Sequence, residues 1–422
     1  MAKLTFQLKY HLLKDTLQKV RDTLEINEIL EYLLDFIRSI VDYDAAGIFI
    51  LSQDFSSNEP NISKQAIAGV MLRGFDNSPV DADDMLMKGK GIIGHVIVSG
   101  KGVIVPDVRK EDRYVIGRKR TKSEIAVPLI HSRKTFGALN LESDHISAYD
   151  TDDLEILEFF ANAASIAIDQ AMLHKQLLER EILRKQLQMA KDVQSKLFPP
   201  EPPIVPGYDI AGICIPAEEI GGDYYDFIKL QQTGLGVIVA DVSGKGIPAA
   251  LIMTAFRAIF RMNAHNRIGI KKIFTSINRQ LPEITGNSHF VTAVYLSLDI
   301  NSDEITYICC GHPPCLLRHA NGFDDLLNVR GPVLGVFNNV DYPLTRFNLE
   351  RGDILLSYTD GVVERLDRDG KQYGVEKLKT ILKDNQYFSS EEIIQQINKG
   401  TQDFSDSVES RDDFTVVVIK KL

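Results

Sequence analysis

The sequence predicts an α+β protein with two folded domains joined by a long helix, and three observations support this. With 422 residues the chain is long for a single domain. Apolar residues recur every three or four positions from Ile166 to Leu197 without glycine or proline, which indicates one extended helix. After Gly207, runs of strand patterns are separated from helical patterns, an order typical of α+β domains.

Composition narrows the class of protein. The net charge of −10 argues against a nucleic-acid-binding surface, which would be basic. The chain has no run of 18 apolar residues and no apolar signal segment at its start, so we expect a cytoplasmic protein that does not contact a membrane. The cysteines lack zinc-site spacing and are interpreted as reduced core residues: Cys214, Cys309, Cys310 and Cys315.

The elements of the first half follow in order along the chain. An amphipathic helix is expected within residues 1–24, before a domain predicted at 25–170. In that domain we expect a helix at 29–41, a strand at 45–51, a glycine-flanked helix and a short strand between 89 and 107, strands at 125–130 and 135–143, and a helix starting near Asp150.

The helix that starts near Asp150 continues as a linker, predicted at 171–198. Its apolar spacing over so many residues favours a coiled coil and therefore a homodimer. A single long helix packed on its own domain is the alternative. The proline-rich stretch from Pro199 to Gly207 ends the helix and marks the boundary of a second domain, predicted at 199–422.

In the second domain, runs of consecutive strand patterns are segregated from helical patterns. Strands are expected at 208–215, 225–230, 235–240, 290–298, 304–310, 315–318, 353–358 and 414–420, and helices at 248–263, 270–284, 375–382 and 390–401.

Four aspartates in this domain lie next to predicted strands: Asp223, Asp241, Asp360 and Asp412. Taken singly, each is more typical of a turn or a solvated loop. If a sheet gathered them, their charges would repel unless cations neutralised them. Oxygen-only ligands suit Mg²⁺ or Mn²⁺, and two such ions about 3.5–4 Å apart can activate water for displacement at phosphorus. The pattern therefore predicts a two-metal hydrolytic site.

Five motifs in the second half resemble, in the same order, those of the SpoIIE-type branch of the PPM (metal-dependent protein phosphatase) family. They read GGDYYDF, ADVSGKGIPAA, GHPP, YTDGVVE and RDDFTVVVI, and the resemblance extends from about Gln194 to the C-terminus. It implies an αββα sandwich holding two Mn²⁺ or Mg²⁺ ions. It also implies hydrolysis of phosphoserine or phosphothreonine on a partner protein by metal-bound water, without a phosphoenzyme.

Site residues follow from the resemblance by motif position. Asp223 and Asp241 would be catalytic as metal ligands, acting through the metal-bound water, with Asp241 bridging the ions. Asp360 would be a third ligand and Asp412 a fourth, with Asp413 as the alternative. The remaining positions are one backbone carbonyl ligand, from Val242, and four supporting residues, Asp226, Gly222, Gly244 and Gly361.

The chain departs from the wider PPM family in its glycine turn. That family often has a histidine after the bridging aspartate, whereas this turn contains Lys245 and no equivalent histidine, so the proton donor is unassigned. Lys245 either contacts the substrate phosphate or is a solvated loop lysine. His312, in the GHPP motif, is expected to order its turn.

The first half resembles a GAF domain. The resemblance rests on GKGIIGHVIVSGKGVIVPDV, EIAVPLI, TFGALNLES and the helix DTDDLEILEFFANAASIAI. It implies a sheet with helices that is often dimeric and can hold a small ligand, here unidentified. A GAF domain that only dimerises is the alternative.

Together these observations predict a GAF-regulated serine/threonine phosphatase coupled through a dimeric helical linker. The resemblance suggests that its substrate is a phosphorylated STAS-type anti-anti-sigma protein in partner switching, with an upstream activator as a further candidate partner. The alternative is a catalytically weak GAF/PPM scaffold that acts by protein binding. A nucleotide-binding kinase is not supported, because neither a GxxxxGK[ST] loop nor kinase motifs are present.

Overall fold

The computed structural model describes residues 26–51, 67–75, 90–131, 134–230, 234–264, 269–286, 288–322, 324–405 and 412–422. The chain forms two compact units, Met1–Ile182 and Leu183–Leu422. The amphipathic helix predicted within residues 1–24 lies outside the described residues.

The first unit is a five-stranded antiparallel sheet in the order β2-β1-β5-β4-β3. Its elements are α2 (Ile26–Arg38), β1 (Ala45–Leu51), β2 (Ile67–Arg73), α4 (Gly91–Ser99), β3 (Val103–Val105), a 3₁₀ turn (Val108–Lys110), β4 (Ser123–His131), β5 (Lys134–Ser143) and the first part of α5 (Thr151–Ser195). Alternate residues of β4 and β5 pack on α2 and α5, and the residues between them pack on α4.

A small polar cluster lies in the first unit, on the face of β4 and β5 that carries Ala126 and Ala138. Glu124 and Glu142 are buried there, and the Asn140 amide donates to both carboxylates. Burial, followed by the charge of Glu142, raises the pKa of Glu124 to about 8. The sequence-based assignment did not include these residues.

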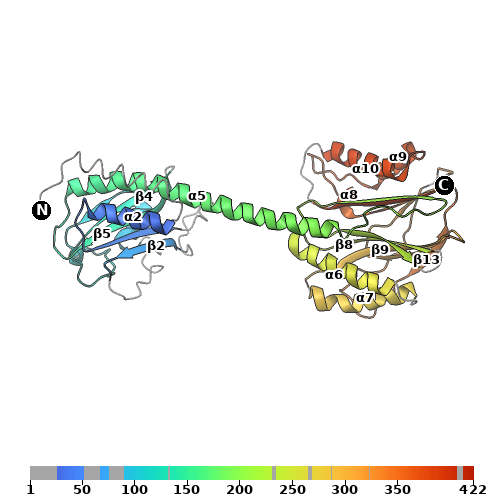
Figure 1. Cartoon of the computed structure of the whole chain (residues 1–422), viewed down its shortest axis with the longest axis horizontal. Coiled ribbons are helices and arrows are strands. Elements are labelled where there is room, and N and C mark those ends of the chain that lie inside the picture. The colour runs from blue at the N-terminus through green and yellow to red at the C-terminus, as the bar shows by residue number, and fades with distance from the viewer. Residues whose placement is uncertain are drawn as a thin grey trace. The chain divides into compact units, whose positions relative to one another are not determined.

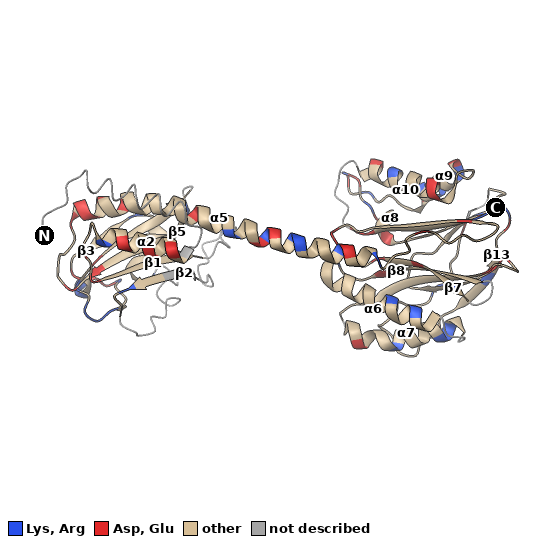
Figure 2. Cartoon of the chain, in the orientation of Figure 1, with Lys and Arg blue, Asp and Glu red and all other residues tan. Residues whose placement is uncertain are grey.

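The long helix predicted from the apolar repeat is confirmed, because α5 continues without a break to Ser195. Acidic and basic residues alternate along its second half (Figure 2). By length and composition alone α5 could cross a membrane, but 44% of its most apolar window is buried within the protein. Leu157, Phe160 and Ile168 pack in the core of the first unit, as in a helix of a soluble domain. The helix is therefore weak evidence for a membrane span.

The second unit is a sandwich of two antiparallel sheets between two layers of helices (Figure 1), which confirms the αββα expectation. One sheet has the order β13-β10-β9-β8-β7 and the other β12-β11-β14-β15-β6. The strands are β6 (Tyr208–Ile215), β7 (Tyr224–Leu230), β8 (Gly234–Val242), β9 (Val291–Asp299), β10 (Glu304–Cys310), β11 (Leu316–Arg318), β12 (Asp324–Leu326), β13 (Leu344–Asn348), β14 (Ile354–Tyr358) and β15 (Phe414–Lys421). The helices are α6 (Gly246–Ala264), α7 (Ile270–Thr285), α8 (Asp360–Val363), α9 (Val375–Asp384) and α10 (Ser390–Ser405).

Strand alternation separates the three apolar layers of this sandwich. Val237 and Val239 of β8 face the other sheet, whereas Ile238 and Ala240 face α6 and α7. Cys309 and Cys310 likewise belong to different layers, as predicted, and all four cysteines are free.

The observed elements differ from the predicted ones at several positions. β8 does not end at Ala240 but continues through Val242, because Asp241 and Val242 pair with Thr292 and Val291 of β9. Strand β2 of the first unit, the short strands β12 and β13 and the four-residue helix α8 were not predicted. Strands of three to five residues carry too little periodicity to be recognised, and their partners in the sheet stabilise them.

Candidate metal centre

Five aspartates from four separate segments gather at one edge of the second unit. Asp223 directly precedes β7, Asp241 lies near the end of β8, Asp360 begins α8, and Asp412 and Asp413 precede β15. The charges of Asp360, Asp412 and Asp413 act on Asp241, and the charges of Asp241 and Asp413 act on Asp223. The two sheets therefore bring together the acids that the sequence singled out.

Asp223 is the most deeply buried of these acids, with 2% of its surface exposed. Its Oδ2 accepts hydrogen bonds from the Thr359 hydroxyl at 2.8 Å and the Thr415 hydroxyl at 2.6 Å. Burial, and then the charges of Asp241 and Asp413, raise its pKa well above the ordinary value. The two threonines hold this carboxylate in place. They were not singled out from the sequence, although they lie within the motifs YTDGVVE and RDDFTVVVI.

Asp241 lies beside Asp223 near the centre of the cluster. Burial raises its pKa to about 7, and the charges of Asp360, Asp412 and Asp413 add to the shift. Burial and the charge of Asp412 also raise the pKa of Asp360. Ionising these buried, neighbouring carboxylates is therefore electrostatically unfavourable, and a bound cation would remove the repulsion between them.

Asp412 and Asp413 are adjacent in sequence but have different surroundings. The Asp413 carboxylate accepts three backbone N–H bonds, from Ala217 at 2.8 Å, Gly222 at 2.8 Å and Asp223 at 3.2 Å. These bonds fasten the loop before β7 to the start of β15. The Asp412 side chain is half exposed, and its Oδ2 lies 3.4 Å from Lys245 Nζ. Asp412 therefore fits a ligand role better than Asp413 does.

Two glycines of the predicted site allow close backbone contacts. A Cβ on Gly361 would lie 2.0 Å from the Asp413 carbonyl oxygen, so only glycine lets α8 approach β15. A Cβ on Gly222 would lie 3.0 Å from the Val242 carbonyl oxygen, which places the proposed carbonyl ligand next to this loop. Gly244 has a φ of +99° and lies beside the His289 ring.

Asp226, predicted to support the metal ligands, has its partners on the helix-covered side of β7. It is buried and forms an ion pair with Arg261 of α6, with Nε 2.6 Å from Oδ2. The Tyr224 hydroxyl donates to the same carboxylate. Tyr224 packs in the layer beneath α6 and α7, whereas Tyr225 faces the other sheet. These contacts of Asp226 thus link β7 to α6, and none of them involves an acid of the cluster.

Two histidines lie near the acidic cluster and differ in character. His312 is buried, and burial lowers its pKa to about 3, so it stays neutral. Its Nδ1 lies 2.8 Å from the Thr292 hydroxyl, which agrees with a role in ordering the turn. His289 is partly exposed and directly precedes Phe290, whose backbone bonds to Ser243. His289 Nδ1 lies 2.8 Å from the Ser243 carbonyl oxygen in the glycine turn.

The donor set of the cluster fits a hard divalent cation. It consists of oxygens only: carboxylates and the backbone carbonyl of Val242. Within the described ranges, no three acidic, histidine or cysteine side chains close around a single point. The carboxylates nevertheless lie near enough to shift one another's pKa. This arrangement suits Mg²⁺ or Mn²⁺, which take one or two carboxylates and complete their shell with water.

Comparison with known families supports the resemblances found in both halves of the chain. Residues 23–169 match the family model for the GAF domain, and residues 231–421 match the family model for stage II sporulation protein E (SpoIIE). The second match includes Asp241, Asp360 and Asp412 but begins after Asp223. The assignment of Asp223 to the cluster therefore rests on the geometry.

Similar proteins include two enzymes of Bacillus subtilis. Phosphoserine phosphatase RsbU is 29% identical over 58% of this chain and 72% of its own length. Phosphoserine phosphatase RsbP is 28% identical over 43% of this chain, and the match covers just under half of RsbP, 46%. Among solved structures, the SiaA-PP2C domain of Pseudomonas aeruginosa aligns with a TM-score of 0.50 at 16% identity, covering 57% of this chain and 98% of that domain. This last likeness shows the fold alone.

Proposed function

Because the chain joins a GAF domain to a SpoIIE-type PPM domain of the serine/threonine phosphatase class, homologous to RsbU and RsbP, we propose that it dephosphorylates phosphoserine or phosphothreonine on a partner protein in the cytoplasm. The observation that carries this proposal is the convergence of Asp223, Asp241, Asp360 and Asp412 at one edge of the sandwich.

The proposed cofactors are two Mn²⁺ or Mg²⁺ ions, held by the four aspartates and the Val242 carbonyl. Such ions neutralise the phosphate charge and make a water nucleophilic near neutral pH. The chain itself keeps Asp223 oriented through Thr359 and Thr415. Lys245, whose Nζ lies 3.4 Å from Asp412 Oδ2, is the cation proposed to contact the substrate phosphate.

The state of the cysteines favours direct hydrolysis over a covalent intermediate on a cysteine. Cys214 lies within electrostatic range of Asp223, and burial raises the pKa of its thiol well above the ordinary value. Burial likewise raises the pKa of Cys309, Cys310 and Cys315. A thiol whose pKa is raised stays protonated and is a poor nucleophile.

We propose His289 as the proton donor that the glycine turn itself lacks. A seryl oxygen leaves phosphorus as a strongly basic alkoxide, so its departure is helped by a general acid. His312 is too deeply buried and too weakly basic for this role. His289 is partly exposed, and the contact of its Nδ1 with the Ser243 carbonyl leaves Nε2 as the second ring nitrogen available for proton transfer.

A His289→Gln variant tests this role through the leaving group. On a phosphoserine peptide we expect kcat to fall about 100-fold, the lower end of the usual contribution of general acid catalysis. On p-nitrophenyl phosphate, whose leaving group is stable as an anion, the loss should be much smaller. Equal losses on both substrates would refute proton donation. His174→Gln, an exposed change on α5, is the matched control.

The substrate class we propose is a phosphorylated STAS-type anti-anti-sigma protein, supported by the similarity to RsbU and RsbP. The full chain with Mn²⁺ should release phosphate from such a protein and from a phosphoserine peptide. EDTA should abolish the release, and added Mn²⁺ should restore it. If no metal-dependent release occurs from any phosphoserine substrate, the catalytically weak scaffold becomes the better interpretation.

For regulation, we propose that the GAF domain acts through a homodimeric coiled coil formed by α5. Apolar residues of α5 are exposed in the single chain, as expected of a helix that pairs with a second copy: Leu173, Leu177, Leu178, Ile182, Leu183, Met189 and Val193. At the end of α5, the Gln194 amide exchanges two hydrogen bonds with Gly221, two residues before Asp223. Sedimentation of the full chain as a monomer at micromolar concentration would exclude this coupling.

A further inference from the structure

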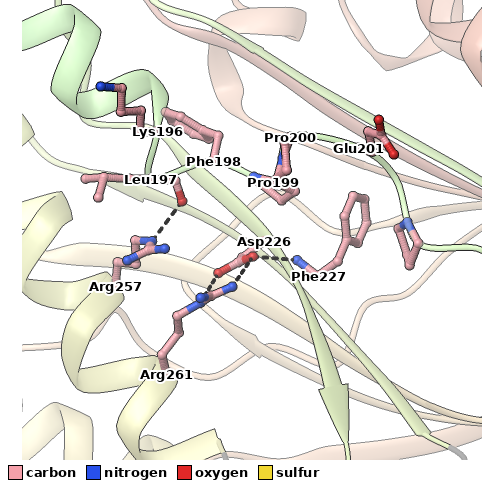
Figure 3. A pocket seen from close by; sticks show the side chains of 11 residues that line it. Lys196, Leu197, Phe198, Pro199, Pro200, Glu201, Asp226, Phe227, Arg257 and Arg261 are labelled. Carbon is pink, nitrogen blue, oxygen red and sulfur yellow. Dashed lines mark hydrogen bonds and ion pairs between the residues drawn. The ribbon is translucent and has the colours of Figure 1, made fainter.

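A pocket of about 310 Å³ lies in the second unit between the end of α5, the proline-rich segment, β7 and α6 (Figure 3). Its wall includes the apolar side chains of Phe198 and Phe227 and the guanidinium groups of Arg257 and Arg261. The volume is at the lower end of the range for small-molecule sites. None of the residues assigned to the metal centre, apart from Asp226, lines it.

The two arginines of this pocket differ in whether an acidic side chain neutralises them. Arg261 is neutralised by Asp226 through two hydrogen bonds, at 2.6 and 3.1 Å. Arg257 is one helical turn earlier on α6, and its Nε donates to the Leu197 carbonyl oxygen at 2.8 Å. Among the described residues, the Nη groups of Arg257 have no acidic partner. By formal charge, Lys196 and Glu201 on the wall offset each other, which leaves one positive charge in excess, that of Arg257.

We propose that this pocket binds a carboxylate attached to a compact apolar body. The Arg257 guanidinium would hold the carboxylate through its Nη fork, and the aromatic and proline side chains would cover the apolar part. A free small molecule and an acidic side chain of a bound protein share this chemistry. The site is separate from the acidic cluster, which repels such anions.

The position of the pocket connects it to the metal centre. Arg257 contacts the carbonyl of Leu197, three residues after Gln194, which holds Gly221 through two hydrogen bonds. A ligand held by Arg257 therefore stabilises the packing of the C-terminal end of α5. Through the bonds between Gln194 and Gly221, it also stabilises the loop that carries Asp223. This regulatory step rests on the proposed phosphatase function, whereas the binding step does not.

Binding is tested on the metal-free full chain, so that the metal centre cannot contribute. The probes are benzoate and the tripeptide Ac-Phe-Glu-Phe-NH₂, measured by calorimetry and thermal unfolding. We expect saturable binding at one site per chain. Tighter binding of benzoate would identify a free small molecule as the source, and tighter binding of the peptide would identify a protein side chain.

Arg257→Gln should weaken binding of the preferred probe at least tenfold, and Arg257→Lys, which keeps the charge without the fork, should weaken it less. Arg279→Gln, an exposed change on the neighbouring helix α7, is the matched control and should bind as the unaltered chain does. Absence of saturable binding by both probes, or equal binding by Arg257→Gln, would overturn the proposal. In the active protein, a saturating probe should lower the Mn²⁺ concentration for half-maximal activity at least threefold.

Discussion

Replacing Asp241 by asparagine should reduce kcat/KM for a phosphoserine peptide by on the order of 10³-fold, a loss of about 4 kcal/mol in transition-state stabilisation. Asp241 lies at the centre of the cluster, where Asp223, Asp360 and Asp412 surround it. It is the proposed bridge between two ions, so the neutral amide would weaken both sites together. Steady-state kinetics at saturating Mn²⁺ measures the effect.

Asp384→Asn is the matched control, because this aspartate is exposed at the end of α9. It should leave kcat/KM unchanged. An Asp241→Asn variant with more than a tenth of the original activity would contradict the two-metal assignment, whatever its metal affinity.

The same substitution should stabilise the metal-free protein at alkaline pH. Burial and neighbouring charge raise the folded-state pKa of Asp241 to about 7, above the ordinary carboxyl value. A carboxyl group with a raised folded-state pKa favours folding at low pH, and this contribution is lost as the pH rises through about 7. With EDTA present, the Tm of the original chain should therefore fall between pH 5 and pH 8, and Asp241→Asn should reduce that fall.

Replacing Gly361 by alanine should have the second largest effect, on both stability and activity. The new Cβ would lie 2.0 Å from the carbonyl oxygen of Asp413, a backbone atom that cannot rotate away. Relieving the clash requires α8 to move from β15, which separates Asp360 from Asp412. We expect a loss of about 1–3 kcal/mol in the free energy of unfolding and a fall in activity beyond that explained by the unfolded fraction.

Gly269→Ala separates this steric effect from the general cost of replacing a glycine. Gly269 precedes α7, and a Cβ there would meet no atom within 4 Å. Urea unfolding and Mn²⁺-dependent hydrolysis should both be near the original values for this control. An active Gly361→Ala variant of normal stability would show that α8 and β15 tolerate separation.

Many strands and helices of the second unit can be predicted from the local sequence pattern. Strand β10 and helix α6 were predicted within two residues of their observed ends, because alternating and 3.6-residue apolar periods are strong there. The aspartates were singled out because each adjoins a strand. Their proximity did not follow from periodicity, which places a residue on a face but does not say which strand ends are neighbours.

Residues whose roles depend on distant contacts were missed or assigned differently. His289 lies 46 residues from Ser243 in sequence, and only the pairing of β8 with β9 brings them together. Asp413 was an alternative ligand by motif, yet three backbone amides occupy its carboxylate. Asp226 was expected to support the ligands, but its partner Arg261 lies on α6. A motif shows which residue type stands at a position. The role of its side chain depends on its hydrogen-bond partners, which come from distant segments.

Local periodicity and the order of the motifs are enough to predict the α+β class, the unbroken helix through Ser195 and the set of acids. Three features became visible only in the folded chain: Thr359 and Thr415 hold Asp223, Arg257 lines a pocket, and Gly361 must lack a side chain. Each of these features joins segments more than 50 residues apart, and it is the packing of the two sheets and their helices that brings such segments into contact.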